Sequence, residues 1–215
     1  PIHRWAGRVF RYSAMVVLGA AGIAVMLNAV RALFVHRLSI ADNPEQWAFL
    51  LFLGYLALVT GVMLSHGIAV LRSKQDLSKL HTPYRILSAW SAMVSSVLII
   101  AFALFYRPDN AILLYALSPL GLLNGRGILK VIAQQATNGP REWLIEHLGA
   151  LLGCGVAFHT AFAVFGMNHF LPVQLSGGWA VIPWILPTLI GVPASILWAR
   201  KYRQQTIKPT APAVG

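Results

Sequence analysis

The sequence predicts an all-α fold, a polytopic membrane bundle of six transmembrane helices. Hydrophobic residues make up 57% of the 215 residues and charged residues only 11%, a balance that would leave a soluble domain of this length unable to cover its apolar surface. Apolar runs of about 20 residues or more, long enough to cross about 30 Å of hydrocarbon as helices, recur along the chain. No run alternates between apolar and polar residues, so a transmembrane barrel is not expected.

Six helices are predicted in order, joined by short polar loops. They run from about Arg11 to Phe34, Trp47 to Leu71, Pro83 to Tyr106, Asn110 to Ala133, Glu142 to Gly166, and Trp179 to Trp198. Thr82 and Pro83 are typical of the N-cap and first residue of the third helix. Pro119, with the glycines that follow it, predicts a kink in the fourth helix, and Pro183, Pro187 and Pro193 predict kinks in the sixth. The irregular fourth helix could wall a ligand site or be a plain kink.

The domain organisation follows from the short loops, which leave no room for a separate soluble domain. We expect a single six-helix transmembrane domain over residues 1–204 and a disordered cytoplasmic tail over residues 205–215, which is rich in Pro and Ala. The opening PIHRWAGRVF has no apolar signal-peptide core and no initiator Met. The sequence therefore allows for another helix upstream of Pro1.

The basic residues predict the orientation, because Lys and Arg near helix ends are retained on the cytoplasmic side. Six crossings place both termini on one side. Fourteen of the seventeen Lys and Arg residues then lie on that side, and only Arg31, Arg37 and Arg107 lie on the other. The sequence thus predicts a bacterial inner-membrane protein with both termini of this segment in the cytoplasm. The formal charge of +11 reflects this topology and attraction to anionic lipid headgroups, so no nucleic-acid partner is expected.

Two histidines are expected at the same depth on the cytoplasmic side. His66 precedes the boundary residue Arg72 by six positions, and His147 follows the boundary residue Arg141 by six. At about 1.5 Å per residue, both lie about 9 Å inside the membrane. His159 lies about 18 Å farther along the fifth helix and about 120° around it, so a four-ligand diheme site is not favoured.

One haem b held by His66 and His147 is the metal and cofactor hypothesis that fits this placement, since imidazole is a good axial ligand and is tolerated in lipid when neutral. Arg126 could pair with the propionates or with another anion. His81 and His3 are expected at the rim of this site. Gly61 and Gly67, which flank His66, and Gly149 and Gly153, which follow His147, leave room either for a flat macrocycle or for a close neighbouring helix.

Other interpretations of the histidines stay open. They could hydrogen-bond between helices, with Ser65, Asn124 or Glu146 as polar partners, or they could form another metal site or a quinone site. Glu146 is also expected as an interface carboxylate near the start of the fifth helix. Clustered carboxylates and a His-Glu-x-x-His helix are absent from the sequence, which disfavours a di-iron or zinc enzyme.

Three stretches carry a resemblance: HRWAGRVF at 3–10, GIAVLRSKQDLSKLHTPYR at 67–85, and WLIEHLGALLGCGVAFHTAFAVFG at 143–166. Together they resemble uncharacterised bacterial predicted multi-pass membrane proteins with a His-Arg-x-x-Gly-Arg helix opening. The resemblance implies an inner-membrane protein whose His3, His81 and His147 belong to the shared pattern, and another helix before that motif. It implies no assigned reaction. A fainter likeness to b-type membrane cytochromes rests only on histidines in helices.

The sequence is therefore compatible with three classes of function. The first is a haem- or quinone-linked redox or electron-transfer protein with a cytoplasm-side histidine site. The second is a non-enzymatic accessory subunit of a larger membrane complex, with hydrogen-bonded packing histidines. The third is a small-molecule transporter built around the broken fourth helix. The expected partners are the lipid bilayer and a membrane protein or a second copy of this chain, which would contact the first or sixth helix.

Overall fold

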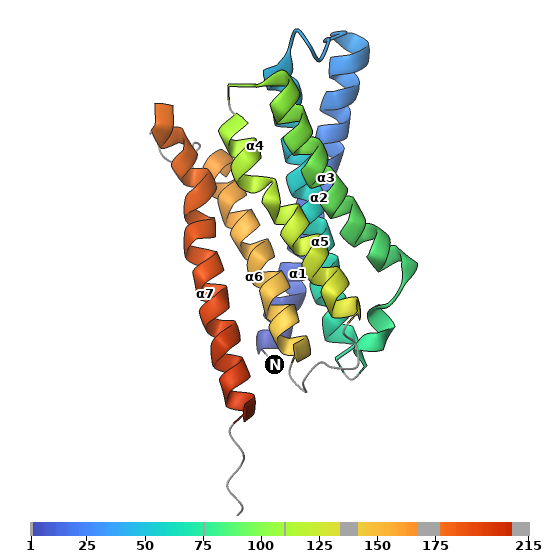
Figure 1. The fold of residues 1–215 in the computed structure, drawn as a ribbon, viewed down its shortest axis with the longest axis vertical. Helices are drawn as coiled ribbons and strands as arrows, with labels where there is room; N and C mark the ends of the chain where they lie inside the picture. Colours follow the sequence, from blue (N-terminus) through green and yellow to red (C-terminus); the bar gives the residue numbers. More distant parts are fainter. Residues whose placement is uncertain (1, 75, 110, 134–141, 167–176, 208–215) are drawn as a thin grey trace, which may run out of the picture. The chain divides into compact units, whose positions relative to one another are not determined.

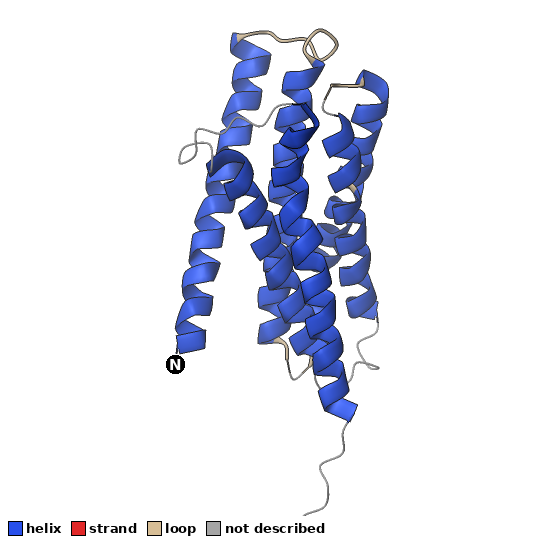
Figure 2. Ribbon diagram, turned by 90° about the vertical axis from the view of Figure 1, so that its left-hand side faces the viewer, coloured by secondary structure: helices blue, strands red, loops and turns tan. Residues whose placement is uncertain are grey.

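The computed structural model describes residues 2–74, 76–109, 111–133, 142–166 and 177–207. Within these ranges the regular elements are helices and no strand occurs (Figure 2). Six helical stretches are long and apolar enough to cross a membrane: Arg4–Val35, Pro44–Arg72, Pro83–Tyr106, Ala111–Ala133, Glu142–Gly166 and Trp179–Tyr202. Each coincides with one predicted run, which confirms the prediction of an all-helical chain with six such helices. The first stretch begins earlier and the last ends later than predicted.

The chain divides into two compact units. Unit 1 comprises Pro1–Ser65 and Thr82–Val131, and unit 2 comprises His66–His81 and Ile132–Gly215. Two of the three boundaries fall inside helices, so α2 and α5 each contribute residues to both units. Each unit is described by itself.

Unit 1 holds α1 (Ile2–Val30), the π-helical turn η1 (Arg31–Val35), most of α2 (Pro44–Arg72), α3 (Pro83–Tyr106), α4 (Ala111–Leu117) and nearly all of α5 (Pro119–Ala133) (Figure 1). Ala32, Trp47 and Leu50 form a buried cluster that joins η1 to the start of α2. The predicted cap of α3 is confirmed, because the Thr82 hydroxyl accepts a hydrogen bond from the Arg85 amide at 3.4 Å.

The fourth apolar stretch is divided into α4 and α5 at Ser118. Pro119 has no amide hydrogen to donate to the Tyr115 carbonyl, and the Ser118 hydroxyl lies 3.5 Å from that carbonyl instead. The hydroxyl of Tyr55 on α2 supplies hydrogen-bond partners for the backbone groups at this break. The Tyr55 hydroxyl lies 2.7 Å from the Ser118 carbonyl and 3.1 Å from the Leu117 carbonyl, and it accepts the Gly121 amide at 2.9 Å. A side chain thus enters the ladder between the amide of residue 121 and the carbonyl of residue 117.

Glycines bring α5 against α3. A side chain at Gly121 would collide with Ser96 and with the Ala92 carbonyl, and one at Gly125 would meet the Ala89 carbonyl at 2.5 Å. The contacts run in opposite order along the two helices, so α3 and α5 are antiparallel. Small residues allow such close backbone approach without a hydrophobic driving force.

Unit 2 holds the last turns of α2, the 3₁₀ turn η2 (Leu77–Leu80), α6 (Glu142–Ala161), the π-helical turn η3 (Phe162–Gly166), the 3₁₀ turn η5 (Gly177–Val181) and α7 (Ile182–Ile207). Helices α6 and α7 pack together, and a side chain at Gly191 would collide with Val156. The rings of Phe165 and Trp184 meet edge to face at 5.7 Å. Helix α7 includes residues 205–207 of the predicted tail, and residues 208–215 lie outside the described residues.

Candidate functional site

The end of α2 lies in direct contact with α6 in unit 2, and Gly67 is one point of this contact. A Cβ atom at Gly67 would lie 2.9 Å from the Ala150 Cβ and 3.5 Å from a methyl group of Leu151. The first distance is shorter than ordinary carbon contact. Glycine is therefore required here for the helices to approach, which is the second of the two readings that the sequence left open.

His147 spans this contact. Its side chain is buried, and the ring nitrogen Nδ1 lies 2.8 Å from the Gly67 carbonyl oxygen. A carbonyl oxygen can only accept, so Nδ1 carries the proton in this bond. The bond satisfies a buried imidazole and ties α6 to the backbone of α2.

His66 and Glu146 form the second link between the same helices. The Nε2 atom of His66 lies 4.0 Å from Oε2 of Glu146, and the exposed fractions of the two side chains are 6% and 30%. The Glu146 carboxylate thus faces the buried imidazole of His66. A position at the membrane interface alone does not describe its surroundings. Together with His147, these residues form a compact polar group on α2 and α6, which we call the His–Glu cluster.

The His–Glu cluster does not fit a haem lying between His66 and His147. Two axial ligands must face each other across the macrocycle. Here His147 instead donates to the carbonyl of Gly67, the residue next to His66, and Gly67 packs against Ala150. The space between α2 and α6 at this level is occupied by helix–helix contact. Among the described residues, no group of three or more His, Cys, Asp and Glu side chains could hold a metal ion.

The other predicted site residues lie on other elements or outside the His–Glu cluster's contacts. Arg126 is exposed on α5 and belongs to unit 1, whereas the His–Glu cluster belongs to unit 2. His81 is exposed at the end of η2, where its backbone amide donates to the Ser78 carbonyl. His3 lies in α1, and its side chain is outside the described residues. His159 is exposed, and its Nδ1 atom lies 2.7 Å from the Gly155 carbonyl of its own helix.

Tyr55 is the polar residue that the sequence reasoning did not single out. Its buried hydroxyl contacts three backbone groups around the break at Ser118 and lies 3.4 Å from the Ser96 hydroxyl. The signal available in the sequence was the combination of Pro119 and Gly121, which leaves backbone groups needing partners in an apolar helix. Nothing in the sequence indicates which helix supplies the partner.

Comparisons with known proteins found no matching family profile, no matching curated protein and no matching solved structure. The function must therefore be argued from the arrangement of the residues.

Proposed function

We propose that this chain is a multi-pass bacterial inner-membrane protein that serves as a non-enzymatic accessory subunit of a larger membrane complex. The observation that carries the proposal is the bond from His147 to the Gly67 carbonyl at the Gly67–Ala150 contact. It supports a role in helix packing for the histidine that the haem hypothesis would use as a ligand. Ionisable side chains in membrane helices are functional candidates by default, and here the function is to join α2 to α6.

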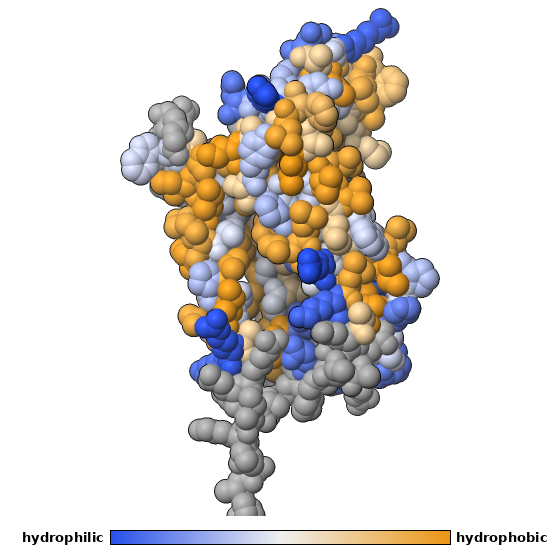
Figure 3. Space-filling model, in the orientation of Figure 1, coloured by the Kyte–Doolittle hydropathy of each residue, from blue (hydrophilic) through white to orange (hydrophobic). Residues whose placement is uncertain are grey.

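The exposed apolar helices support a partner. Only 6% of the most apolar stretch of Arg4–Val35 is buried, against 39% for Pro44–Arg72. Large apolar side chains along α1, including Val16, Ile23 and Met26, are largely exposed. Lipid or a membrane protein must cover such a helix. In Figure 3, apolar residues, drawn in orange, cover much of the visible face.

The proposed orientation follows from the distribution of Lys and Arg, with fourteen residues on one side of the membrane and three on the other. This distribution puts both termini of this segment in the cytoplasm. We also propose that the fourth span bends where Pro119 interrupts it and that the sixth bends at Pro187 and Pro193. The resemblance to multi-pass bacterial membrane proteins supports the same cellular location.

The test is an absorption spectrum. Protein purified from cells supplied with haem should lack reduced-minus-oxidised haem bands, and H66A and H147A should each lose about 1 kcal/mol of stability without any spectral change. H159A is the matched control, because His159 bonds only within its own helix in the described structure. A coloured parent whose bands disappear in both H66A and H147A would establish the redox alternative instead.

The accessory role has its own test. Protein extracted from membranes in mild detergent should show a native mass above that of the monomer, and an apolar-to-charged change such as I23E on the exposed face of α1 should release the monomer. A parent that is monomeric throughout would contradict the accessory role without affecting the assignment of the histidines.

A further inference from the structure

Two cations on α5 lie far from the described carboxylates of their own unit. Arg126 and Lys130 are both exposed, and no hydrogen bond or ion pair joins either to another described residue. The carboxylates of unit 1 are Asp42, Glu45 and Asp109, and all three lie near the opposite ends of α2 and α3. Glu45 is moreover engaged there, since it accepts the Asp109 amide at 2.5 Å. The anion that neutralises Arg126 and Lys130 must therefore come from outside this unit.

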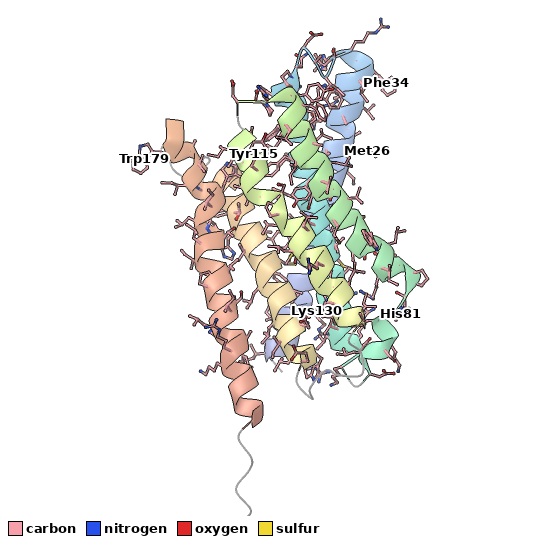
Figure 4. All side chains as sticks on the ribbon, in the orientation of Figure 1. Met26, Phe34, His81, Tyr115, Lys130 and Trp179 are labelled. Carbon is pink, nitrogen blue, oxygen red and sulfur yellow. The ribbon has the colours of Figure 1, made fainter. Side chains whose placement is uncertain are left out.

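The two side chains are placed to hold one anion. They are four residues apart on a helix, about 6 Å along its axis, and therefore share a face. Gly127 is exposed beside this pair, about 60° around the helix from Lys130, and a Cβ atom there would meet nothing within 4 Å. The open surface at Gly127 leaves space for a tetrahedral group between a guanidinium and an ammonium. Lys130 is labelled near the end of α5 in Figure 4.

The positions of Arg126 and Lys130 along the apolar stretch indicate which kind of anion they bind. The apolar stretch ends at Ala133, so the Arg126 backbone lies about 10 Å inside that end and Lys130 about 4–5 Å. Toward the middle of the span the same face carries Leu123, which is 67% exposed. Long basic side chains at this depth reach outward to headgroup level and leave apolar surface below them. An anion with an attached acyl chain matches both parts of this surface.

Helix α3 adds positive charge at the same end. The Gly125–Ala89 contact sets α3 antiparallel to α5, so one turn further toward Ala133 on α5 corresponds to Arg85 on α3. The Arg85 guanidinium donates to the Ser65 carbonyl at 3.4 Å. Arg85 is held by α2 and raises the local potential without needing to contact the anion itself.

We infer that Arg126 and Lys130, with the open surface at Gly127, bind the phosphate of an anionic glycerophospholipid whose acyl chain lies along Leu123. The inference rests on the proposed membrane location, but it does not depend on the accessory role or on the histidines. It assigns Arg126 to a lipid phosphate in place of haem propionates.

The test compares lipid retention in native mass spectra of detergent-purified full chain. The parent should retain phosphatidylglycerol in preference to phosphatidylcholine. R126Q/K130Q should lose that preference by about fivefold for each cation removed. R200Q/K201Q is the matched control, because it removes two exposed cations from α7 and should behave as the parent. The single variants R126Q and K130Q give the same comparison if the double variant does not accumulate.

Three outcomes overturn the inference: no preference in the parent, equal loss in both double variants, or displacement of the lipid by inorganic phosphate alone, which would assign the pair to a free anion. Failure of the membrane location is separately visible, since the parent would then be recovered without detergent.

Discussion

The Nδ1 atom of His147 lies 2.8 Å from the carbonyl oxygen of Gly67, where α2 packs directly against α6. The absence of a side chain at Gly67 thus permits the hydrogen bond as well as the packing. Stability at this contact should depend on both residues.

Gly67→Ala should destabilise the protein by about 1–3 kcal/mol, because the new methyl group would overpack the contact with Ala150. Thermal unfolding in detergent measures the effect. Gly61→Ala on the same helix is the control, since a Cβ atom there meets nothing within 4 Å. That variant should be neutral or slightly stabilised. Equal effects of the two substitutions would show that α2 and α6 are not in contact at Gly67.

His66 and Glu146 should be energetically coupled. A double-mutant cycle with H66A and E146Q should give an interaction free energy of about 0.5 kcal/mol or more, because the His66 Nε2 and Glu146 Oε2 atoms lie 4.0 Å apart. A cycle that pairs H159A with E146Q should give additive effects. Additivity in both cycles would remove Glu146 from the His–Glu cluster.

Tyr55→Phe should cost about 1–3 kcal/mol, because it leaves the Gly121 amide and the Ser118 carbonyl without their buried partner. Tyr115→Phe is the matched control, since Tyr115 is exposed on α4 and should tolerate the loss of its hydroxyl. Unfolding measurements on both variants make the comparison. A tolerant Tyr55→Phe variant would mean that the backbone at the break is satisfied without α2.

Asp76 should make the η2 turn sensitive to acid. Hydrogen bonds from the Ser78 hydroxyl and the Ser78 amide lower the pKa of the Asp76 carboxyl. A carboxyl whose pKa is lower in the folded state stabilises the turn above its unfolded pKa of about 3.9 and loses this effect as the pH falls through the lowered value. The protection factor of the Ser78 amide against hydrogen exchange should therefore fall as the pH drops through the lowered pKa, and Asp76→Asn should remove that pH dependence.

Reporter fusions at Pro1 and after residue 207 should both report the cytoplasm, because the proposed topology places fourteen of the seventeen basic residues on that side. A fusion after residue 40, in the loop between α1 and α2, should report the periplasm. Any other combination would reverse the orientation or change the number of crossings.

The sequence was sufficient for the features that depend on nearby residues. Helix positions follow from runs of apolar residues, and the start of α3 follows from Thr82 and Pro83, whose effect is local. Counting from the boundary arginines also placed His66 and His147 at equal depth, and the structure brings His147 to the residue beside His66.

Features that depend on the rotation of one helix against another were not predictable. Gly67 could have faced a macrocycle, lipid or a helix, and only the packing of α2 on α6 decides between them. Tyr55 and Ser118 are 63 residues apart, and no periodicity within either helix indicates that they meet. The placement of Arg126 in a different unit from the histidines is likewise a property of the assembled chain.

The contact of the Tyr55 hydroxyl with the break at Ser118 makes the fourth span depend on the second span during synthesis of the chain. The fourth span carries a proline and an interrupted ladder, so alone in hydrocarbon it would expose polar backbone groups that have no water to bond. Its missing partner belongs to the second span, which the ribosome produces more than fifty residues earlier. In the proposed membrane topology the fourth span therefore needs the second span beside it to satisfy its backbone, and synthesis in chain order provides the second span first.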